Sequence, residues 1–422
     1  MKKIVIANLN KAAAGVVFDQ WNPPPAYADT AEKTDIPKEK ACYVQLFQKE
    51  HPSLIGNIYI GHVRDVVRNI EAAFVEFDSQ TLGYLSFKNA APVFVNRKNT
   101  EKICEGDNLI VQVAKDKIKT KDAVLTANFE LPGRFAVITH GKSRISFSSK
   151  IRDEHYKRTL SDKLQTFLTE KIPSIPYGII IRTEAYHAEY ENITEELLAL
   201  DAEYHRIIDL AKTRQKYYML KQAEPEVLRF LKSSLEKDRE CEIITDDSKI
   251  YSRILENKET SAFENCSIRF YEDKLLPLYK LYSLENVFHD IYSDKVWLKS
   301  GAYLVIEYTE AMTVIDVNTG KCEKGKSKEA TFLKINLEAA LEIARQLRIR
   351  NISGIIIVDF IDMPLESHVK TLLEYTRQVM SEDPVKTTVV DITRLHLMEI
   401  TRRKTTDKIP YIADLFENPN TP

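Results

Sequence analysis

Cysteine and long apolar runs are scarce in this chain of 422 residues. The five cysteines are scattered, odd in number and never spaced as CxxC, so the sequence predicts neither a disulfide framework nor a zinc ligand set and favours the reducing cytoplasm. No apolar run approaches the roughly 18 residues that a membrane helix needs, so we expect no membrane span. The formal net charge is −2, which excludes a globally basic nucleic-acid binder but leaves local patches open.

The length predicts about two to four domains, and the sequence pattern changes along the chain. Residues 51–127 carry short alternating strands such as NIYIGHV and LGYLSF, which predict a five-stranded barrel of the OB-fold type. Residues 1–50 and 225–283 each hold too few strands to bury a sheet alone, so we expect them to share one. Residues 128–224 contain the strand patterns RFAVITH and YGIIIRT around a charged helical stretch, and residues 284–422 alternate strands with helices.

Two aspartates end two apolar strand patterns in the last segment. Asp316 closes MTVID, Asp359 closes GIIIVD, and a helical stripe lies between them. That stripe consists of Leu333, Leu337, Ala340, Leu341, Ala344 and Leu347. A strand, helix, strand unit nearly always forms a right-handed parallel crossover, which brings both aspartates to the same edge of a sheet. A second helical stripe follows, formed by Val369, Leu372, Leu373 and Val379.

A divalent cation suits this acidic pair. Asn318 lies two residues after Asp316, and two carboxylates with an amide form the oxygen-rich donor set that Mg²⁺ or Mn²⁺ prefers. The alternative is that either aspartate caps the following turn, and Asp362 is a weaker candidate that also fits a turn or a helix cap. The surrounding basic residues would suit a polyanion; they are Lys321, Lys324, Lys326, Lys328, Arg345, Arg348, Arg350, Arg402, Arg403 and Lys404.

The barrel segment contains two candidate exposed aromatics, Phe74 and Tyr84, and the nearby lysines Lys115, Lys117 and Lys121. Bases of single-stranded RNA stack on aromatic side chains in such barrels while lysines follow the phosphates. The alternative is that the aromatics belong to the barrel core and that the lysines form a solvated surface.

Arg182 and Thr183 follow directly on the buried strand pattern of YGIIIRT. An arginine fork and a hydroxyl at a strand end can hold a phosphate. The alternative is an arginine in a surface ion pair.

Several of these segments resemble the ribonuclease E/G family. They are EAMTVIDVN from Glu310, NLEAALEIARQLRIRN from Asn336, GIIIVDFIDM from Gly354 and LMEITRRK from Leu397. The barrel strands NIYIGHV, IEAAFVEF and LGYLSF are similar to the RNA-binding OB-fold of that family. The resemblance covers nearly the whole chain and is closest to the ribonuclease G type.

The resemblance implies a multidomain architecture of α/β and β domains. An RNase H-like subdomain in residues 1–50 and 225–283 is split around an OB-fold in residues 51–127 and a 5′-phosphate sensor region in residues 128–224, and a DNase I-like catalytic domain occupies residues 284–422. The implied activity is that of a metal-dependent endoribonuclease that cuts single-stranded RNA, leaves 5′-phosphate and 3′-hydroxyl ends, and serves rRNA processing and mRNA decay.

The resemblance also implies roles for individual residues. Asp316 and Asp359 match the catalytic metal ligands, and Asn318 matches the residue that orients them. Phe74, Tyr84 and Lys121 match RNA-binding positions, Tyr84 replacing a more usual phenylalanine. The implied pocket for a 5′-monophosphate consists of Gly133, Val137, Arg182, Thr183 and Lys386. Lys386 stands where some members have arginine, so it keeps the charge but loses the planar fork.

One motif of the family is missing. Members commonly carry a CPxCxG zinc-link motif soon after the catalytic domain, whereas no cysteine follows Arg403 here. We therefore expect no zinc, no zinc-bridged dimer and a compact, catalytic-core-only member, with another kind of oligomer left open.

The alternative function is a non-catalytic RNA-binding factor in ribosome or RNA maturation, against which the intact metal residues argue. A deoxyribonuclease fits less well, because the barrel aromatics suit single strands.

Overall fold

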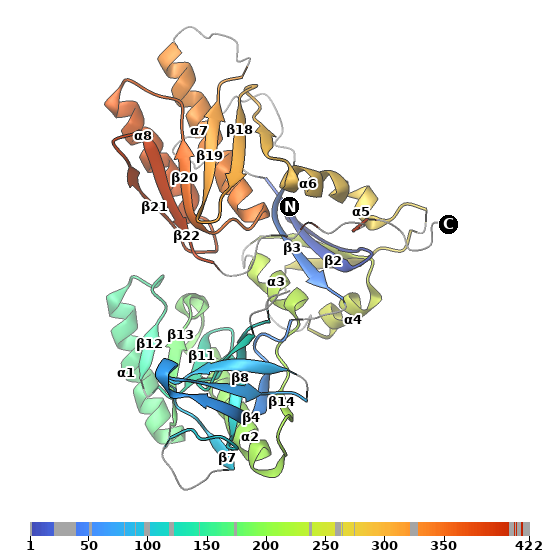
Figure 1. The fold of residues 1–422 in the computed structure, drawn as a ribbon, viewed down its shortest axis with the longest axis vertical. Coiled ribbons are helices and arrows are strands. Elements are labelled where there is room, and N and C mark those ends of the chain that lie inside the picture. The colour runs from blue at the N-terminus through green and yellow to red at the C-terminus, as the bar shows by residue number, and fades with distance from the viewer. Residues whose placement is uncertain are drawn as a thin grey trace. The chain divides into compact units, whose positions relative to one another are not determined.

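The computed structural model divides the chain into two compact units, Met1–Pro52 with Glu226–Pro422 and Ser53–Pro225 (Figure 1). It describes residues 2–20, 39–49, 53–79, 81–88, 90–96, 102–117, 122–142, 144–172, 175–235, 239–257, 263, 265–273, 275–320, 328–404, 409, 411 and 415–416. Within these residues, none of the helices combines the length and the apolarity needed to cross a membrane.

The unit Ser53–Pro225 contains a closed barrel of five strands. In sheet order these are β4 (Ile58–Val67), β5 (Ala72–Glu76), β6 (Leu82–Ser86), β9 (Ala123–Thr126) and β8 (Asn108–Lys115), and β8 pairs back onto β4. Short strands β14 (Met219–Lys221) and β7 (Phe94–Asn96) extend the sheet, and η2 (Arg68–Ile70) links β4 to β5. A Cβ on Gly61 would lie 2.5 Å from Val75 Cγ1, so glycine lets the barrel interior pack this closely. The predicted five-stranded barrel is confirmed.

The same unit holds a second sheet beside the barrel. Its strands, in order, are β10 (Glu130–Pro132), β11 (Ala136–His140), β13 (Tyr177–Ile181) and β12 (Ile145–Phe147). Its helical elements are α1 (Glu154–Lys171), η3 (Thr183–His187) and α2 (Tyr190–Thr213). Leu160, Leu164 and Leu168 recur at helical spacing on α1 and are buried in this core. The patterns RFAVITH and YGIIIRT therefore form paired strands, β11 and β13.

One sheet of the other unit combines chain segments that are far apart in sequence. Its order is β16 (Cys266–Phe270), β15 (Cys241–Thr245), β1 (Lys2–Asn8), β2 (Ala12–Asp19) and β3 (Lys40–Gln48). Two cores lie against this sheet, and they contain residues of α3 (Glu226–Ser234) and α4 (Ser248–Glu256) in one and of α5 (Leu278–Leu281) and α6 (Leu284–Tyr292) in the other. The parallel pairing of β1 with β15 joins the first segment to residues 241–245. The domain boundaries expected from the sequence stay a prediction.

The second sheet of this unit carries the two aspartates. Its order is β17 (Lys295–Trp297), β18 (Tyr303–Tyr308), β19 (Met312–Asn318), β20 (Gly354–Asp359), β22 (Leu397–Arg402) and β21 (Thr387–Ile392). The adjacent strands β19 and β20 run parallel and are connected through α7 (Lys328–Ile349), while α8 (Glu366–Ser381) precedes β21 (Figure 1).

Both predicted helical stripes of this region contact the apolar core of the sheet. Leu337 and Leu347 of α7 and Leu372 and Val379 of α8 are buried in it, so both predicted helices are confirmed. Strand residues alternate between that core and the opposite face, which therefore presents its side chains away from α7 and α8. On the opposite face, Ile355 is 48% exposed.

Candidate active site

Asp316 and Asp359 are direct neighbours at the carboxyl ends of β19 and β20. The parallel register pairs Asp316 with Asp359, one step after the pair formed by Ile315 and Val358. Ile315 and Val358 are fully buried in the core that contains α7 and α8. Because side chains alternate along a strand, the two carboxylates project from the opposite face, where both are exposed. The structure thus brings the two predicted residues together.

Asn318 completes this acidic group. It lies on the same face as Asp316 because the two residues are two positions apart on one strand. Its Nδ2 donates a hydrogen bond of 2.7 Å to Asp316 Oδ2. The amide therefore fixes the orientation of that carboxylate and leaves the other Asp316 oxygen for a further partner.

The site has an excess of negative charge. Partial desolvation, together with the negative charges of Asp316 and Asp362, raises the pKa of the Asp359 carboxyl above its ordinary value. Asp362 lies in the loop after β20, so the residue considered a weaker candidate contributes a third carboxylate to the electrostatics. In the part of the chain that the structure describes, no lysine or arginine forms an ion pair with these three aspartates. Uncompensated like charges at a strand edge are the setting that a bound cation relieves.

The donor set fits Mg²⁺ or Mn²⁺ rather than a cation that needs many protein ligands. Among the described residues, no group of three or more His, Cys, Asp and Glu side chains has metal-binding geometry. The donors that the strand register brings together are the carboxylates of Asp316 and Asp359 and the Asn318 amide. Mg²⁺ characteristically uses one or two carboxylates and keeps its other positions for water and phosphate oxygen.

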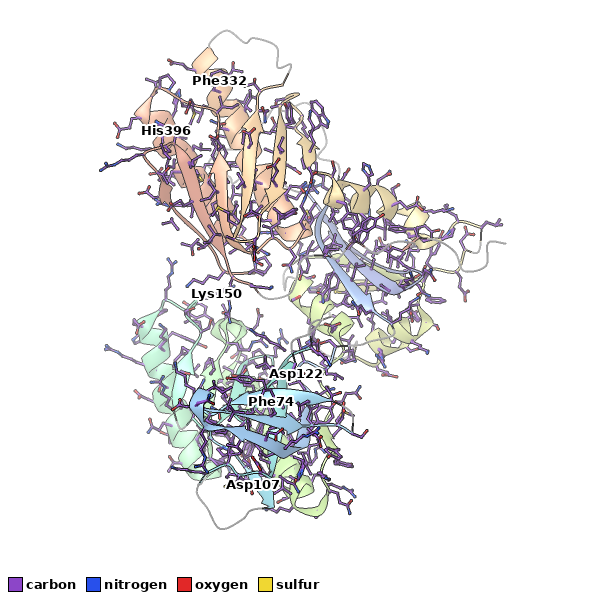
Figure 2. All side chains as sticks on the ribbon, in the orientation of Figure 1. Phe74, Asp107, Asp122, Lys150, Phe332 and His396 are labelled. Atoms are coloured by element: carbon purple, nitrogen blue, oxygen red, sulfur yellow. The ribbon has the colours of Figure 1, made fainter. Side chains whose placement is uncertain are left out.

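A small pocket adjoins the acidic edge. It is lined by Phe360, Ile361, Asp362, Met363, Val369, Leu372, Ile392 and His396. His396 occupies the turn between β21 and β22 (Figure 2) and has a φ of 63°, in the left-handed region that residues other than glycine seldom adopt. The sequence carries no periodic signal for this position, because the turn rather than a strand or helix pattern places it beside Asp362.

The expected basic surroundings are wrong for Arg345 of α7 and for Arg350, which follows directly after that helix. Arg345 is buried, donates from Nε to Glu342 Oε1 at 2.8 Å and donates from Nη1 to the Ala41 carbonyl at 2.8 Å. Arg350 is also buried and donates to the Asp290 carbonyl at 2.9 Å. These guanidinium groups join α7 to neighbouring segments and are not presented to a polyanion. Lys321, Lys324 and Lys326 lie outside the described residues.

The two predicted RNA-binding aromatics are cross-strand neighbours on the barrel. Phe74 of β5 pairs with Tyr84 of β6, and their ring centroids lie 6.2 Å apart in an edge-to-face arrangement. Their neighbours Val75 and Leu85 fill the barrel core, so the half-buried rings lie on its outer face (Figure 2 labels Phe74). The alternative reading of both rings as interior core residues is therefore wrong.

A lysine, Lys115, lies in line with these two aromatic rings. The strand register continues from Tyr84 to Val124 and from Val124 to Lys115, whose side chain is exposed. Phe74, Tyr84 and Lys115 thus follow one line across four strands. Lys121, the lysine singled out from the resemblance, lies outside the described residues.

Four of the five predicted phosphate-pocket residues gather at the end of β13. Arg182 donates from Nη1 to the Gly133 carbonyl at 2.6 Å, and Thr183 Oγ1 lies 3.2 Å from Ser148 Oγ. Val137 is half-buried on β11, the strand paired with β13. Arg182 makes no ion pair with a carboxylate within the described ranges, so the reading of it as a surface ion pair is not supported.

The backbone around Gly133 is held by a carboxylate from α2. Glu196 accepts hydrogen bonds from the backbone N–H groups of Arg134, Phe135 and Ala136. A Cβ on Gly133 would lie 2.6 Å from Glu196 Cδ, so glycine is required for this close approach. Lys386 is exposed just before β21 in the other compact unit, and its part in a phosphate pocket stays a prediction.

Comparison with known proteins decides the family. The model of the Ribonuclease E/G family matches residues 130–405. The chain is 33% identical over 386 residues to Ribonuclease G of Escherichia coli (strain K12), covering 87% of this chain and 76% of that protein. It is 31% identical over 358 residues to Ribonuclease E of Nostoc sp., covering 83% of this chain and 51% of that protein. This chain belongs to the ribonuclease E/G family.

Family membership confirms the resemblance found in the sequence and the expectation of an enzyme of a ribonuclease family. The matched range contains the acidic pair, Asn318 and the residues around Arg182, whereas Phe74 and Tyr84 precede it. The roles of the individual residues are not assigned by these comparisons and stay predictions.

Proposed function

We propose that this family member is a divalent-metal-dependent endoribonuclease that hydrolyses single-stranded RNA in RNA processing and decay, leaving 5′-phosphate and 3′-hydroxyl ends. The observation that carries the proposal is the in-register pair of Asp316 and Asp359, with Asn318 bonded to Asp316 and no cationic partner described. The names of the relatives, Ribonuclease G and Ribonuclease E, support RNA as the substrate.

Each residue of the acidic group has a distinct role in this proposal. Asp316 and Asp359 hold Mg²⁺ or Mn²⁺, and Asn318 keeps the Asp316 carboxylate in one orientation. When bound there, such a cation would supply charge neutralisation at the scissile phosphate and would lower the pKa of a bound water. The exposed face of the sheet lets an RNA strand approach both carboxylates without a large rearrangement, because both already project from that face.

RNA binding by the barrel adds affinity that does not depend on the acidic pair. We assign Phe74 and Tyr84 to base stacking, and the lysines Lys115 and Lys121 to the phosphates. The five-stranded closed barrel supports the name OB-fold for residues 51–127. In the same proposal the shared sheet of residues 1–50 and 225–283 is RNase H-like and residues 284–422 form a DNase I-like domain.

The pocket at the end of β13, around Arg182 and Thr183, is proposed to bind the 5′-monophosphate of an RNA. Arg182 offers guanidinium donors that are not neutralised by a described carboxylate, and Thr183 and Ser148 offer hydroxyl groups. A terminal phosphate, which carries up to two negative charges shared over three oxygens, would satisfy these donors better than a 5′-hydroxyl. Lys386 is proposed to contribute charge to this recognition.

A substrate panel tests the proposed activity. Matched RNA and DNA oligonucleotides, single- and double-stranded, are incubated with the protein with and without Mg²⁺, and the product ends are mapped. We expect cleavage of single-stranded RNA only when Mg²⁺ is present, with 5′-phosphate products. Asp316→Asn, purified in the same way, controls for contaminating nucleases. RNA binding without cleavage by the unaltered protein would favour the non-catalytic RNA-binding factor instead.

Substitution of Arg182 tests the 5′ pocket. The unaltered protein should cut 5′-monophosphorylated RNA faster than the same RNA with a 5′-hydroxyl, and Arg182→Ala should remove a preference of about tenfold. Arg144→Ala, which removes another exposed arginine of the same unit, serves as the control and should keep the preference. Equal rates of the unaltered protein on the two substrates would contradict the assignment of the pocket.

A further inference from the structure

Two aromatic rings and a lysine form a cluster on the same sheet as the acidic pair. Lys295 and Trp297 belong to β17, and Tyr303 belongs to β18. Lys295 Nζ lies 4.2 Å from the centroid of the Trp297 ring and 3.6 Å from that of the Tyr303 ring. The two ring centroids are 5.2 Å apart. The ammonium group thus holds both rings through cation–π contacts.

This cluster lies on the face of the sheet that carries the carboxylates. Val296 packs against the apolar core, so its neighbours Lys295 and Trp297 project from the opposite face. Leu304 of β18 is fully buried in that core, so Tyr303 projects with them. No aromatic or basic signal in the sequence distinguishes these residues, because their common face depends on the pairing of two hairpins.

The register places the cluster beside the acidic group. Trp297 pairs with Tyr303, and Tyr303 pairs with Asn318, so these three residues form one row across the sheet. The next row contains Lys295, Val305, Asp316 and Asp359. Two strand spacings separate the Trp297 backbone from that of Asn318, a distance of about 10 Å. The cluster is therefore next to the proposed cleavage site and on the same surface.

The exposure of Trp297 is large for a residue of this kind. Its side chain is 63% exposed, although Val296 already provides the packing of this edge strand. Large amphipathic rings held rigidly at a surface are typical of recognition sites, because they bury much area at little conformational cost. The neighbouring lysine adds a positive charge, which favours a polyanion over an apolar protein surface.

We propose that Trp297 and Tyr303 form a stacking site for an unpaired base of the RNA next to the cleaved phosphodiester, with Lys295 contacting a flanking phosphate. The proposal rests on the endoribonuclease function above and adds a subsite that positions the strand at the acidic pair. Base stacking on an aromatic ring is sequence-tolerant, since every base has a π face. This subsite would therefore fix the position of the RNA strand rather than select a particular base.

Fluorescence tests the contact without any cleavage. The chain has two tryptophans, Trp21 and Trp297, so Trp21→Phe leaves Trp297 as the sole indole reporter. Without divalent metal, single-stranded RNA should quench its emission in a saturable way, whereas an abasic oligonucleotide of the same length should not. Unchanged emission at RNA concentrations that saturate a parallel filter-binding measurement would overturn the proposal.

An abasic scan then locates the base that is bound. Single-turnover cleavage is measured on RNAs that lack one base at each position around the cleavage site. One neighbouring abasic position should slow the unaltered protein about fivefold to a hundredfold. Trp297→Ala should slow cleavage of the complete RNA by a similar factor and become insensitive to that abasic position. Trp297→Phe should retain the sensitivity, because phenylalanine still stacks.

The controls separate this proposal from the proposed function. Tyr411, which is 76% exposed and packs against Tyr292, provides the matched variant Tyr411→Ala, which should keep the abasic profile of the unaltered protein. Thermal unfolding of each variant shows whether the fold is intact.

If the unaltered protein cleaves RNA but Trp297→Ala has the same rate and abasic profile, the stacking site is wrong and the nuclease assignment stands. If the unaltered protein cleaves no RNA, the nuclease assignment fails, and the quenching result still decides whether Trp297 contacts a base.

Discussion

The paired strands β20 and β22 carry a buried, paired charge at one end and, among the described residues, an exposed, unpaired charge at the other. At one end, Arg402 opposes Gly354 and donates from Nε to Asp383 Oδ2 at 2.8 Å, and the two charged side chains are 0% and 2% exposed. At the other end, Asp359 opposes Leu397 and is exposed beside the like charges of Asp316 and Asp362. A single pair of strands thus carries a compensated buried charge and an uncompensated exposed one.

This difference separates a charge whose partners are all supplied by the chain from charges that stay open to a ligand. Arg402 also donates from Nη1 to Asn351 Oδ1 at 3.1 Å and to the Ile352 carbonyl at 3.0 Å, so the described contacts account for all three guanidinium nitrogens. A buried charge with a complete set of partners holds segments together and offers nothing to a ligand. The acidic end has the opposite property, since its charges repel one another until a ligand of opposite sign arrives.

The largest effect is expected when the buried ion pair of Arg402 and Asp383 is broken. Asp383→Asn removes the counter-charge of a fully buried guanidinium, so we expect the free energy of unfolding to fall by about 3–5 kcal/mol. Denaturant unfolding followed by circular dichroism measures this loss. Asp391→Asn is the control, because Asp391 is exposed on β21, and should change stability by less than about 0.5 kcal/mol. A similar small change for Asp383→Asn would show that the ion pair contributes little.

The same substitution at the other end should separate activity from stability. If Asp359 is a metal ligand as proposed, Asp359→Asn is expected to lower single-turnover RNA cleavage by at least about a hundredfold, because the variant loses that ligand. Its stability without metal should be unchanged or higher, because one of three mutually repelling carboxylates is gone. RNA binding should persist through the barrel. Cleavage within a few-fold of the unaltered protein would contradict the metal-ligand assignment.

The contrast also shows what the sequence can and cannot reveal. The adjacency of Asp316 and Asp359 was predictable, because two strands and an intervening helical stripe are local patterns whose crossover has one preferred hand. The burial of Arg345 was not predictable, because the carbonyl group to which it donates belongs to Ala41, far away in the sequence. The Trp297 cluster was missed for a different reason, because its residues lie on consecutive strands close together in the sequence. Its common face with Asn318 follows from strand register and not from any local pattern.

A smaller effect is expected from Asn318, which donates a hydrogen bond to Asp316. Asn318→Ala removes the 2.7 Å hydrogen bond to Asp316 Oδ2 but leaves both carboxylates, so cleavage should fall about tenfold to a hundredfold. The Mg²⁺ concentration needed for half-maximal cleavage should rise, which a purely structural role of Asn318 would not produce. Thr319→Ala, one residue further on, should leave that concentration unchanged. An unaltered Mg²⁺ requirement in Asn318→Ala would mean that Asn318 does not position a metal ligand.

The smallest effect concerns the pH dependence of stability without metal. Partial desolvation and two like charges raise the pKa of Asp359 in the folded protein above its ordinary value, so the folded state retains this proton at a pH where the unfolded chain has released it. Acidification from above the raised pKa to below the ordinary one should therefore favour folding at this site, whereas it weakens carboxylates that have cationic partners.

The comparison of unaltered protein with Asp359→Asn isolates that contribution. Because Asp359 is exposed, the unaltered protein should gain less than about 1 kcal/mol relative to the variant as the pH falls through this range. Saturating Mg²⁺ should abolish the gain, since a bound cation opposes protonation of its carboxylate ligands. Denaturant unfolding over a pH series, with and without Mg²⁺, measures both. A relative loss of stability on acidification without metal would show that a cationic group of the chain already compensates Asp359, and the distinction between the two ends of β20 would no longer hold.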